Sequence, residues 1–404
     1  MKITGARLFD PANGKMGEAG DIFVDGATIG GDGGGAVIDG RGCIALPGGI
    51  DIHAHCYAVA EMGKKVPLGV WGDAARTARS FLSQGITYWV EPGLAAAQGA
   101  AFAAFARGCG MDGGWLSLEH DAPGALGVKR FGEAGVADAL SNIFSKNPPH
   151  LHLPRLAHGE GFEVLKSFAR RSRGRRIHLA HISHYAFEKN GSRLVPRGEA
   201  AAVLLDEHEH LSADCGPVVF GPALTFTADA GLAARISRSG GGETMCHPES
   251  PFAAAPYEFK KERYIDAALW LAAMEFILSA QDLSRLSLSI DYPSGGSVSG
   301  YPAIMAMLME RDRRAAFCAA LNADAVAASA LPHIRRELTL GEIAVITRAA
   351  PAAACGLAER GHLGNGAHAD VVLLRESGDV EGMFAHPHHV IRNGQCIVEN
   401  GTWK

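Results

Sequence analysis

The sequence predicts an α/β protein: a TIM-like (β/α)8 barrel with a small β-sandwich domain built from both ends of the chain. Two observations predict this fold. Short apolar runs separated by glycine turns occur at both ends, and a long middle region alternates strand-like runs with helical stretches. Alternation of this kind over about 300 residues favours a parallel barrel. We place the sandwich domain in residues 1–47 and 355–404, and the barrel in residues 48–354.

The two ends of the chain share one pattern. Near the N-terminus, brief apolar runs end in glycine turns, as in ITGARLFD, GDIFVDGATIG and GGAVIDGRG. Near the C-terminus, Asn-Gly turns separate similar runs, as in ADVVLLRE, HHVIRNG and QCIVENG. Asn-Gly between alternating apolar residues is typical of a hairpin. We therefore expect both ends to form strands and to meet in space.

The middle region contains two kinds of segment. Apolar runs such as ITYWVEPG, RIHLAHIS and LSLSIDYP indicate strands, whereas AALWLAAMEFILSA and GYPAIMAMLMERDRRAAFCAAL carry apolar residues at helical spacing. The segment CIALPGGIDIHAHC is expected to be the first barrel strand. Pro47 and the two glycines after it mark the crossing from the sandwich into the barrel.

Composition and charge narrow the class of protein. Hydrophobic residues make up 47% and charged residues 20% of the chain, as in an ordinary globular protein. Lys and Arg total 38 against 43 Asp and Glu, a net charge of −5 that argues against a nucleic-acid binder. The sequence carries no signal-peptide pattern and no long apolar run, so we expect no membrane contact and a cytoplasmic location. Eight cysteines without a C-x-x-C pair fit reduced thiols in that compartment.

The first barrel segment ends in His53-Ala-His55. On a strand, residues two apart face the same side, so both imidazoles are expected to point into the barrel mouth. Such barrels keep their chemistry at the C-terminal ends of their strands. Two neutral imidazoles on one face can bind one cation. A lone H-x-H is a weak signal, and the preceding Leu-Pro-Gly-Gly-Ile-Asp strengthens this one.

Histidines recur near the ends of two later strands. His150 and His152 follow an Asn-Pro-Pro turn, and the segment RRIHLAHISHY contains His178, His181 and His184. A single histidine of this kind is more often a satisfied core or surface imidazole, and we favour that interpretation for His178 and His184. For His152 and His181 we favour metal binding, because they follow the H-x-H in order and lie near predicted strand ends.

Asp291 lies at the exit of the late strand LSLSIDYP, just before Pro293 and a Gly-Gly pair. An aspartate at such a position commonly forms a turn or caps a helix. In a barrel that already holds four histidines, we expect it instead to act as a general base. A carboxylate there can ligate one metal and take the proton from a water molecule.

The order H-x-H, Lys, His, His, Asp resembles that of the amidohydrolase superfamily. Within it, the chain resembles the branch that contains the catalytic subunit of formylmethanofuran dehydrogenase and its bacterial relative in the formyltransferase/hydrolase complex of methylotrophs. The resemblance covers nearly the whole chain, and the entry motif PGGIDIHAH is shared across the superfamily. The more specific blocks are SADCGPVVFGPALTFTADA, WLAAMEFILSAQDLSRLSLSIDYPSGGSVSGYPAIMAMLM and ELTLGEIAVITRAAPAAACGLAERGHLGNGAHADVVLL.

The resemblance implies a binuclear site with two divalent metal ions, and zinc is the expected metal. Lys129, in GVKRFGEAG, matches a lysine that bridges the two metals as a carbamate. A bare ammonium has three donors and no acceptor, so only the carboxylated form can ligate a cation. If the match shifts by one pleat, His150 replaces His152. The metal positions that the resemblance implies are His53, His55, Lys129, His152, His181 and Asp291.

The activity that the resemblance implies is hydrolysis of the formyl amide of formylmethanofuran, or of an analogue, to formate and free methanofuran in C1 metabolism. Asp291 would take the proton from the attacking water and pass it to the leaving nitrogen. The family works beside a formyltransferase and at least one further protein chain. A hetero-oligomer that acts on a formylated C1 carrier is therefore implied.

The chain departs from the family in the surroundings of these ligands. The family's Asp-His-Pro is Asp291-Tyr292-Pro293 here, and the Cys-Asn-Asn after its third histidine is Leu153-Pro154-Arg155. The chain is also shorter than typical members. All six metal positions are kept, whereas the changed neighbours leave the tail of the substrate undetermined. Tyr292 and His184 are the candidates for contacts with the substrate.

Two other interpretations remain at this point. A cyclic amide or imide hydrolase of the dihydroorotase and hydantoinase type would use the same metal residues, but SADCGPVVFG and Asp291-Tyr292-Pro293 point away from it. A non-catalytic barrel protein within a multi-subunit complex is the second interpretation, although a scaffold has no reason to keep six ligands. The metal content of the purified protein separates a scaffold from an enzyme.

Overall fold

The computed structural model describes residues 1–32, 34–141, 147–154, 159–191, 193–227, 230–238, 243–246 and 252–404. Arg155, one of the positions at which the sequence departs from the family, lies outside these ranges. Among the described residues, no helix is both long and apolar enough to span a lipid bilayer.

The middle of the chain forms a barrel of eight parallel strands, which confirms the predicted fold class. The strands pair in the order β18-β14-β11-β10-β9-β8-β7-β6. They are nearly continuous apolar runs because helices outside and side chains inside bury both faces of each strand. Their bounds are β6 (Gly49–Asp51), β7 (Ile86–Leu94), β8 (Asp112–Ser117), β9 (Gly127–Phe131), β10 (His150–His152), β11 (Ile177–Leu179), β14 (Leu211–Cys215) and β18 (Leu286–Leu288).

The segment that we expect to be the first barrel strand is divided between two sheets. Its first part, β5 (Cys43–Pro47), belongs to a sheet formed by the chain ends, and only β6 pairs with β7 in the barrel. The division falls at Gly48, where a Cβ atom would lie 2.2 Å from Thr87 Oγ1. Because only glycine permits such a close approach, the chain crosses between the sheets here. His53 and His55 consequently lie beyond the end of the strand.

The barrel closes between its first and last strands. Ala54 and Tyr292, which follow β6 and β18, form a single parallel bridge. The His55 backbone N–H donates to the Tyr292 carbonyl oxygen at 2.7 Å. This contact brings Asp291, the neighbour of Tyr292, next to the H-x-H segment.

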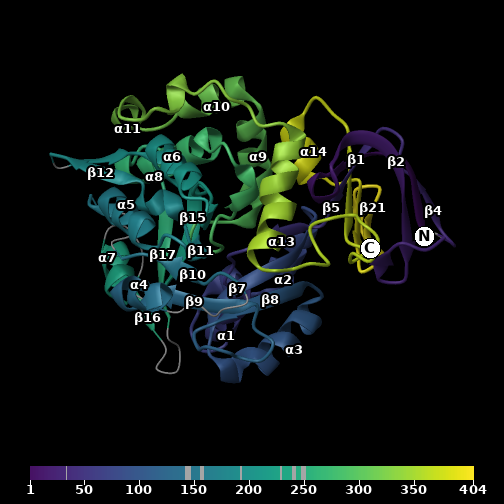
Figure 1. Ribbon diagram of the computed structural model, residues 1–404, viewed down its shortest axis with the longest axis horizontal. Coiled ribbons are helices and arrows are strands. Elements are labelled where there is room, and N and C mark those ends of the chain that lie inside the picture. Colours follow the sequence, from purple (N-terminus) through teal and green to yellow (C-terminus); the bar gives the residue numbers. More distant parts are fainter. Residues whose placement is uncertain are drawn as a thin grey trace.

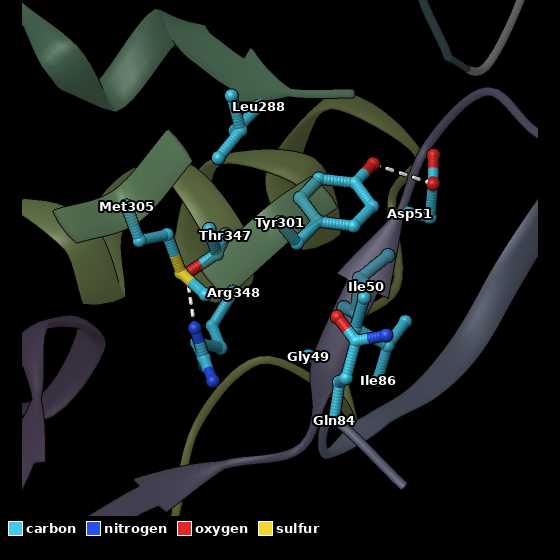
Figure 2. A pocket seen from close by; sticks show the side chains of 10 residues that line it. All are labelled: Gly49, Ile50, Asp51, Gln84, Ile86, Leu288, Tyr301, Met305, Thr347 and Arg348. Carbon is cyan, nitrogen blue, oxygen red and sulfur yellow. Dashed lines mark hydrogen bonds between the residues drawn. The ribbon is translucent and has the colours of Figure 1, made fainter. Parts of the chain in front are cut away.

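Side chains complete the closure deeper in the barrel. The hydroxyl groups of Ser289 and Tyr301 donate to the two carboxylate oxygens of Asp51, at 2.7 and 2.6 Å. Figure 2 shows the Tyr301 hydroxyl directed at Asp51, beside a small cavity of about 20 Å³. The tyrosine oxygen also accepts the Ile290 backbone N–H at 3.1 Å. We call Asp51, Ser289 and Tyr301 the seam residues.

Helices surround the barrel strands (Figure 1). Both long helical stretches that the sequence predicts are present: the first is α8, and the second forms α9 and α10. The helices are α1 (Cys56–Gly63), α2 (Ala74–Leu82), α3 (Gly99–Cys109), α4 (Gly132–Ser141), α5 (Gly161–Arg171), α6 (Gly198–Glu207), α7 (Ala230–Arg238), α8 (Tyr264–Ser279), α9 (Tyr301–Met309), α10 (Arg311–Cys318), α11 (Ala323–Ala327), α12 (Leu340–Ala344), α13 (Ala350–Ala354) and α14 (Val380–Ala385).

Two small antiparallel sheets are inserted into the barrel. The strands β12 (Phe187–Asn190) and β13 (Arg193–Pro196) form a hairpin between β11 and α6. A three-stranded sheet of β15 (Gly221–Thr227), β17 (Ala253–Phe259) and β16 (Met245–Cys246) lies in the chain between β14 and α8. This second sheet contributes one wall of the main cavity, which is described below.

The two ends of the chain meet in one nine-stranded sheet, in the order β22-β21-β20-β19-β5-β1-β2-β3, with β4 beside β1. Figure 1 shows the N-terminal and C-terminal strands side by side at one end of the molecule. The domain limits that we place at residues 47/48 and 354/355 stay a prediction. The strands are β1 (Lys2–Asp10), β2 (Lys15–Asp25), β3 (Thr28–Ile29), β4 (Val37–Asp39), β5 (Cys43–Pro47), β19 (Val371–Arg375), β20 (His389–Arg392), β21 (Gln395–Glu399) and β22 (Thr402–Trp403).

Candidate metal centre

Six of the side chains that the sequence singles out converge at the C-terminal mouth of the barrel. They come from strands that are far apart in the sequence but neighbours in the barrel. All of them except His152 and Asp291 are fully buried, and those two are partly buried. His53 and His55 follow β6, Lys129 lies on β9, His152 ends β10, His181 follows β11, and Asp291 follows β18.

Two triads of ligand atoms form within this cluster. The ligand atoms of His53, His152 and His181 lie within 4.8 Å of one another, and so do those of His53, His55 and Asp291. Asp291 lies between the triads, with Oδ1 3.6 Å from His55 Nε2 and Oδ2 3.4 Å from His181 Nε2. These separations suit ligands that each lie about 2 Å from a central ion.

Several of these atoms are buried without a hydrogen-bond partner, namely His55 Nδ1, His181 Nε2 and Asp291 Oδ1. Burying a polar atom without a hydrogen bond costs free energy. A bound cation would satisfy His181 Nε2 and Asp291 Oδ1. Imidazole nitrogens with a carboxylate oxygen are the donors that zinc and similar divalent ions take. The residues present therefore fit a metal centre.

The histidines of the cluster are mostly held neutral. Burial, reinforced by the positive charge of Lys129, keeps the pKa values of His53, His55 and His152 well below the usual range. Burial also lowers the pKa of His181, but the nearby carboxylates of Asp214 and Asp291 outweigh it and raise that pKa overall. Neutral imidazole is the form that ligates a metal.

Lys129 is buried inside the barrel and not on the surface. Its side chain is 1% exposed, and its Nζ lies 3.5 Å from His53 Nε2. Burial lowers the pKa of Lys129 to about 7, although Asp214 and Asp291 act in the opposite direction. A substantial fraction of the amine is therefore unprotonated at neutral pH, and this is the form that can react with CO2.

Asp291 has an unusual backbone conformation and an unusual pKa. Its φ of 55° lies in the left-handed region, which costs free energy for a residue other than glycine. The Gly295 backbone N–H donates to its carbonyl oxygen at 2.9 Å and supports this turn. Burial raises the pKa of Asp291 to about 7. A carboxyl group with that pKa can both accept and release a proton near neutral pH.

Sequence reasoning misses two buried carboxylates beside the cluster. Asp214, at the end of β14, lies 3.3 Å from His53 Nδ1 and 2.9 Å from His181 Nδ1. Glu91, on β7, lies 3.8 Å from His55 Nδ1 and accepts the Tyr57 backbone N–H at 2.6 Å. The available signal is an acidic residue inside an otherwise apolar barrel strand, in LSADC and in ITYWVEPG.

Three further histidines that the sequence analysis names, His150, His178 and His184, lie near the cluster. His150, next to Lys129 across the β9–β10 pairing, packs its ring 4.3 Å from that of His178. Among the described residues, His152 and not His150 belongs to a triad of ligand atoms. His184 lines the main cavity, and its ring lies 5.8 Å from that of His181.

Among the described residues that line the main cavity, Asp291 is present and its neighbour Tyr292 is not. Its hydroxyl forms a hydrogen bond of 2.8 Å with Thr77 Oγ1 of α2. Its ring packs against Phe81 of the same helix and against Trp71. This placement does not favour a direct contact between the Tyr292 hydroxyl and a substrate.

All the metal-ligand candidates except Lys129 lie in the wall of a cavity of about 510 Å³. This volume is typical of a small-molecule site. The inserted sheet supplies much of its apolar wall through Phe226 and Phe259, and Phe252 adjoins that sheet. The ring of Phe226 lies 5.1 Å from that of His55, so apolar surface reaches the ligands themselves.

Comparison with known proteins matches the expected family. The sequence model of the amidohydrolase family matches residues 280–398. Over 99% of its length, the chain is 27% identical to one subunit of the formyltransferase/hydrolase complex Fhc of Methylorubrum extorquens, of which it covers 88%. Over 98% of its length, it is 23% identical to protein FwdA of Methanocaldococcus jannaschii, of which it covers 87%.

The fold also matches a solved structure. A chain of the formyltransferase/hydrolase complex FhcABCD of Methylorubrum extorquens, crystallised with methylofuran, superposes with a TM-score of 0.88 and 25% identity. The match covers 100% of this chain and 89% of that one. The resemblance to amidohydrolases and to this complex, first seen in the sequence motifs, is confirmed.

Proposed function

We propose that this chain is a metal-dependent hydrolase that cleaves the formyl amide of a formylated C1 carrier of the methanofuran type. The products would be formate and the free amine of the carrier. The observation that carries this proposal is the buried cluster at the barrel mouth, where two triads of ligand atoms share His53. The similarity to the Fhc subunit over nearly the whole chain supports the choice of a formyl carrier.

Two divalent ions, with zinc as the expected metal, would be held by this cluster. One ion would bind near His55 and Asp291, the other near His152 and His181, with His53 close to both. When bound, such ions polarise a carbonyl oxygen and lower the pKa of water to about 7. Burial keeps the pKa values of His53, His55 and His152 low, so these three imidazoles are ready to ligate without first losing a proton.

Lys129 would bridge the two ions as a carbamate. The neutral Nζ adds its lone pair to the carbon of CO2, and one N–H proton is released. The new N–C bond turns the neutral amine into an anion with two oxygens, which can ligate. The burial of Lys129 and its 3.5 Å distance from His53 Nε2 support this assignment.

Asp291 would move the proton. It takes one proton from water as the water oxygen attacks the formyl carbon, and it delivers that proton to nitrogen as the C–N bond breaks. The amide and one water thus give formic acid and the free amine, and the acid then releases its proton to become formate. The pKa of about 7 that burial gives Asp291 suits both steps, because it allows either protonation state at neutral pH.

The cavity would hold the part of the carrier next to the formamide. Its apolar wall of Phe226, Phe252 and Phe259 suits an apolar or aromatic group. His184 lines the same cavity, and burial lowers its pKa to about 3, so its imidazole is neutral and can exchange a hydrogen bond with the carrier.

We further propose that the chain works in the cytoplasm, in a hetero-oligomer with a formyltransferase and other proteins, because the Fhc subunit belongs to a formyltransferase/hydrolase complex.

The test combines metal content with formate release. Purified protein is analysed for zinc, manganese, iron and nickel, and it is assayed for formate released from formylated methylofuran. We expect about two metal ions per chain. The variant His53→Ala should hold fewer ions. The variant Asp291→Asn should keep the ion bound by His53, His152 and His181, but its activity should fall by about 100-fold or more.

An exposed histidine provides the control. His386 lies beyond the end of α14, so His386→Ala should keep both metal and activity. Protein that neither contains nor takes up metal would refute the enzyme and favour the scaffold interpretation. Full metal content with activity only on cyclic amides or imides would favour the other hydrolase interpretation.

A further inference from the structure

The carboxylate of Asp214 faces one backbone N–H and three histidine ring nitrogens. Asp214 is fully buried at the end of β14. Its Oδ1 accepts the His181 backbone N–H at 2.8 Å and lies 2.9 Å from His181 Nδ1. Its Oδ2 lies 3.3 Å from His53 Nδ1 and 3.3 Å from His178 Nε2. One buried side chain therefore connects two candidate metal ligands and a third histidine that the proposed reaction does not use.

This arrangement determines where the ring protons are. An ionised carboxylate is an acceptor only, with about four lone-pair sites on its two oxygens. Each ring nitrogen that faces Asp214 must therefore carry a hydrogen. A neutral imidazole with its hydrogen on Nδ1 has its lone pair on Nε2. In both His53 and His181, Nε2 is the atom that faces Asp291, at 3.9 and 3.4 Å.

We propose that Asp214 is a positioning residue that fixes His53 and His181 as Nδ1–H tautomers, so that both present the Nε2 lone pair to the metal centre. The two rings lie 4.1 Å apart between their centroids. One carboxylate therefore sets the tautomers of both rings. Outer carboxylates of this kind are known to orient metal-bound histidines and to raise their basicity.

Asp214 also holds the backbone of His181. The φ of His181 is 51°, in the left-handed region that a β-carbon disfavours. The backbone N–H and the ring nitrogen of this residue both meet Asp214 Oδ1. The same carboxylate therefore stabilises the strained backbone that aims the ring and the tautomer that the ring needs.

His178 completes the set of donors around Asp214. Its ring is fully buried, its Nε2 faces Asp214 Oδ2, and its Nδ1 lies 3.0 Å from Ser212 Oγ. With hydrogen on Nε2, His178 can accept the Ser212 hydroxyl hydrogen at Nδ1. His178 thus fills the last acceptor site of Asp214 and keeps that carboxylate from rotating. Its role is exerted through Asp214 and not on a substrate.

The inference rests on the metal centre of the proposed function, but its main readout needs neither metal nor substrate. In metal-free protein labelled with 15N-histidine, long-range proton–nitrogen spectra report which ring nitrogen is protonated. Signals can be assigned by their loss in His53→Gln and His181→Gln. We expect hydrogen on Nδ1 of both residues. Hydrogen on Nε2 alone in either residue of the wild type would overturn the proposal.

The variant Asp214→Asn tests the consequence for the metal. An amide has one acceptor oxygen and one donor group, so its NH2 must face at least one of the former N–H partners. We expect His53 or His181 to change to the Nε2–H tautomer. The dissociation constant for Zn2+, measured by competition with a chelator, should rise by about 10–100-fold. Unchanged tautomers with unchanged zinc affinity would contradict the role of Asp214.

Asp51 offers a matched control. It is equally buried, near the end of a barrel strand, and it accepts three hydrogen bonds, from Tyr301, Ser289 and the His53 backbone. None of these donors is an imidazole ring. Asp51→Asn should therefore lower stability without changing the ring tautomers.

If Asp214→Asn does not fold, the wild-type spectrum still decides the proposal. Correct tautomers and zinc binding in a protein without formyl-amide activity would refute the proposed function and leave this inference intact.

Discussion

Lys129 occupies a position that suits an unmodified lysine poorly. Its side chain is buried beside the metal-ligand candidates, with Nζ 3.5 Å from His53 Nε2. Burial lowers its pKa to about 7, which shows how strongly the surroundings disfavour the ammonium form. A carbamate would place anionic oxygens where the ammonium now lies. At the scale of the residue, the modification removes the conflict between an ammonium group and a cluster of side chains that suits a metal cation.

The carbamate leads to a testable prediction. In Lys129→Ala, formate release should fall by about two orders of magnitude, the scale on which loss of a group at a reacting centre is felt. Acetate or propionate should restore part of this activity, because a small carboxylate can fill the space left by the carbamate. Formate assays with and without added carboxylate, together with metal analysis, measure both effects.

Lys129→Arg serves as the control for this rescue. Its guanidinium keeps a positive charge and fills the space, so added carboxylates should not restore activity. Two bound metals and full activity in Lys129→Ala, without any added carboxylate, would show that the lysine does not bridge the ions.

Residues differ in how far the sequence could predict them. His53 and His55 could be predicted because their spacing lies within one segment, and His152, His181 and Asp291 because each ends a recognisable apolar run. The resemblance to a family was needed for Lys129. The contacts of Asp214 could not be predicted, since they depend on how β6, β11 and β14 meet inside the barrel.

At the scale of elements, strand positions could be predicted better than strand limits. The runs that contain β7, β11 and β18 stand out in the sequence, and all three are barrel strands. In the segment that contains β5 and β6, Pro47 and the two glycines after it predict a crossing between the sheets, but they do not show that the barrel strand is as short as β6. The limit is set by a close approach of Gly48 to Thr87, which lies far away in the sequence.

The seam residues, Asp51, Ser289 and Tyr301, connect the first and last strands where regular pairing is reduced to one bridge. Tyr301→Phe removes the hydroxyl that donates to Asp51 and accepts from Ile290. It leaves a buried carboxylate oxygen and a buried N–H without partners. We expect a loss of about 1–3 kcal/mol in the free energy of unfolding. Denaturant midpoints of wild type and variant measure this loss.

A second tyrosine serves as the control for Tyr301→Phe, because its variant shows how much stability is lost with a tyrosine hydroxyl outside the seam residues. The Tyr264 hydroxyl donates to the Leu194 carbonyl oxygen at 2.8 Å in a half-buried setting, where water can replace it. Tyr264→Phe should therefore cost clearly less. Equal losses in the two variants would mean that the seam has no special part in closing the barrel.

At the scale of the whole molecule, the nine-stranded sheet packs against the barrel through one of its strands, β19. Along β19, Val371 and Leu373 belong to the core of the nine-stranded sheet. The alternate residues Val372 and Leu374 belong to the main core of the barrel. Period-two alternation sends successive side chains to opposite faces, so a single strand contributes to both cores. The sequence predicts both parts, but the contact between them depends on residues that no local pattern connects.

Arg360 provides the polar part of this contact. Its guanidinium donates to Asp112 Oδ2 of β8 at 2.8 Å and to Asp370 Oδ2 beside β19 at 2.6 Å. It also lies over the Tyr88 ring, 4.5 Å from the ring centroid. Burial raises the pKa of Asp112, but the Arg360 charge outweighs it, so that pKa is lowered overall. One arginine thus holds a partly buried carboxylate on β8 and a buried carboxylate just before β19.

Removing Arg360 should weaken the whole molecule in a pH-dependent way. Arg360→Met removes the guanidinium that both carboxylates contact, and we expect a loss of about 3 kcal/mol near neutral pH. Because the folded pKa of Asp112 lies below its ordinary value of 3.8, its stabilising contribution is present above that value and is lost as pH falls through the folded pKa. The gap between the unfolding midpoints of wild type and variant should therefore be largest at neutral pH and should narrow below about pH 4.

The exposed pair of Arg7 and Glu376 is the control, since Arg7→Met should change the midpoint little at any pH. A gap that stays constant from neutral to acidic pH would show that Arg360 acts through packing on Tyr88 and not through its carboxylate partners.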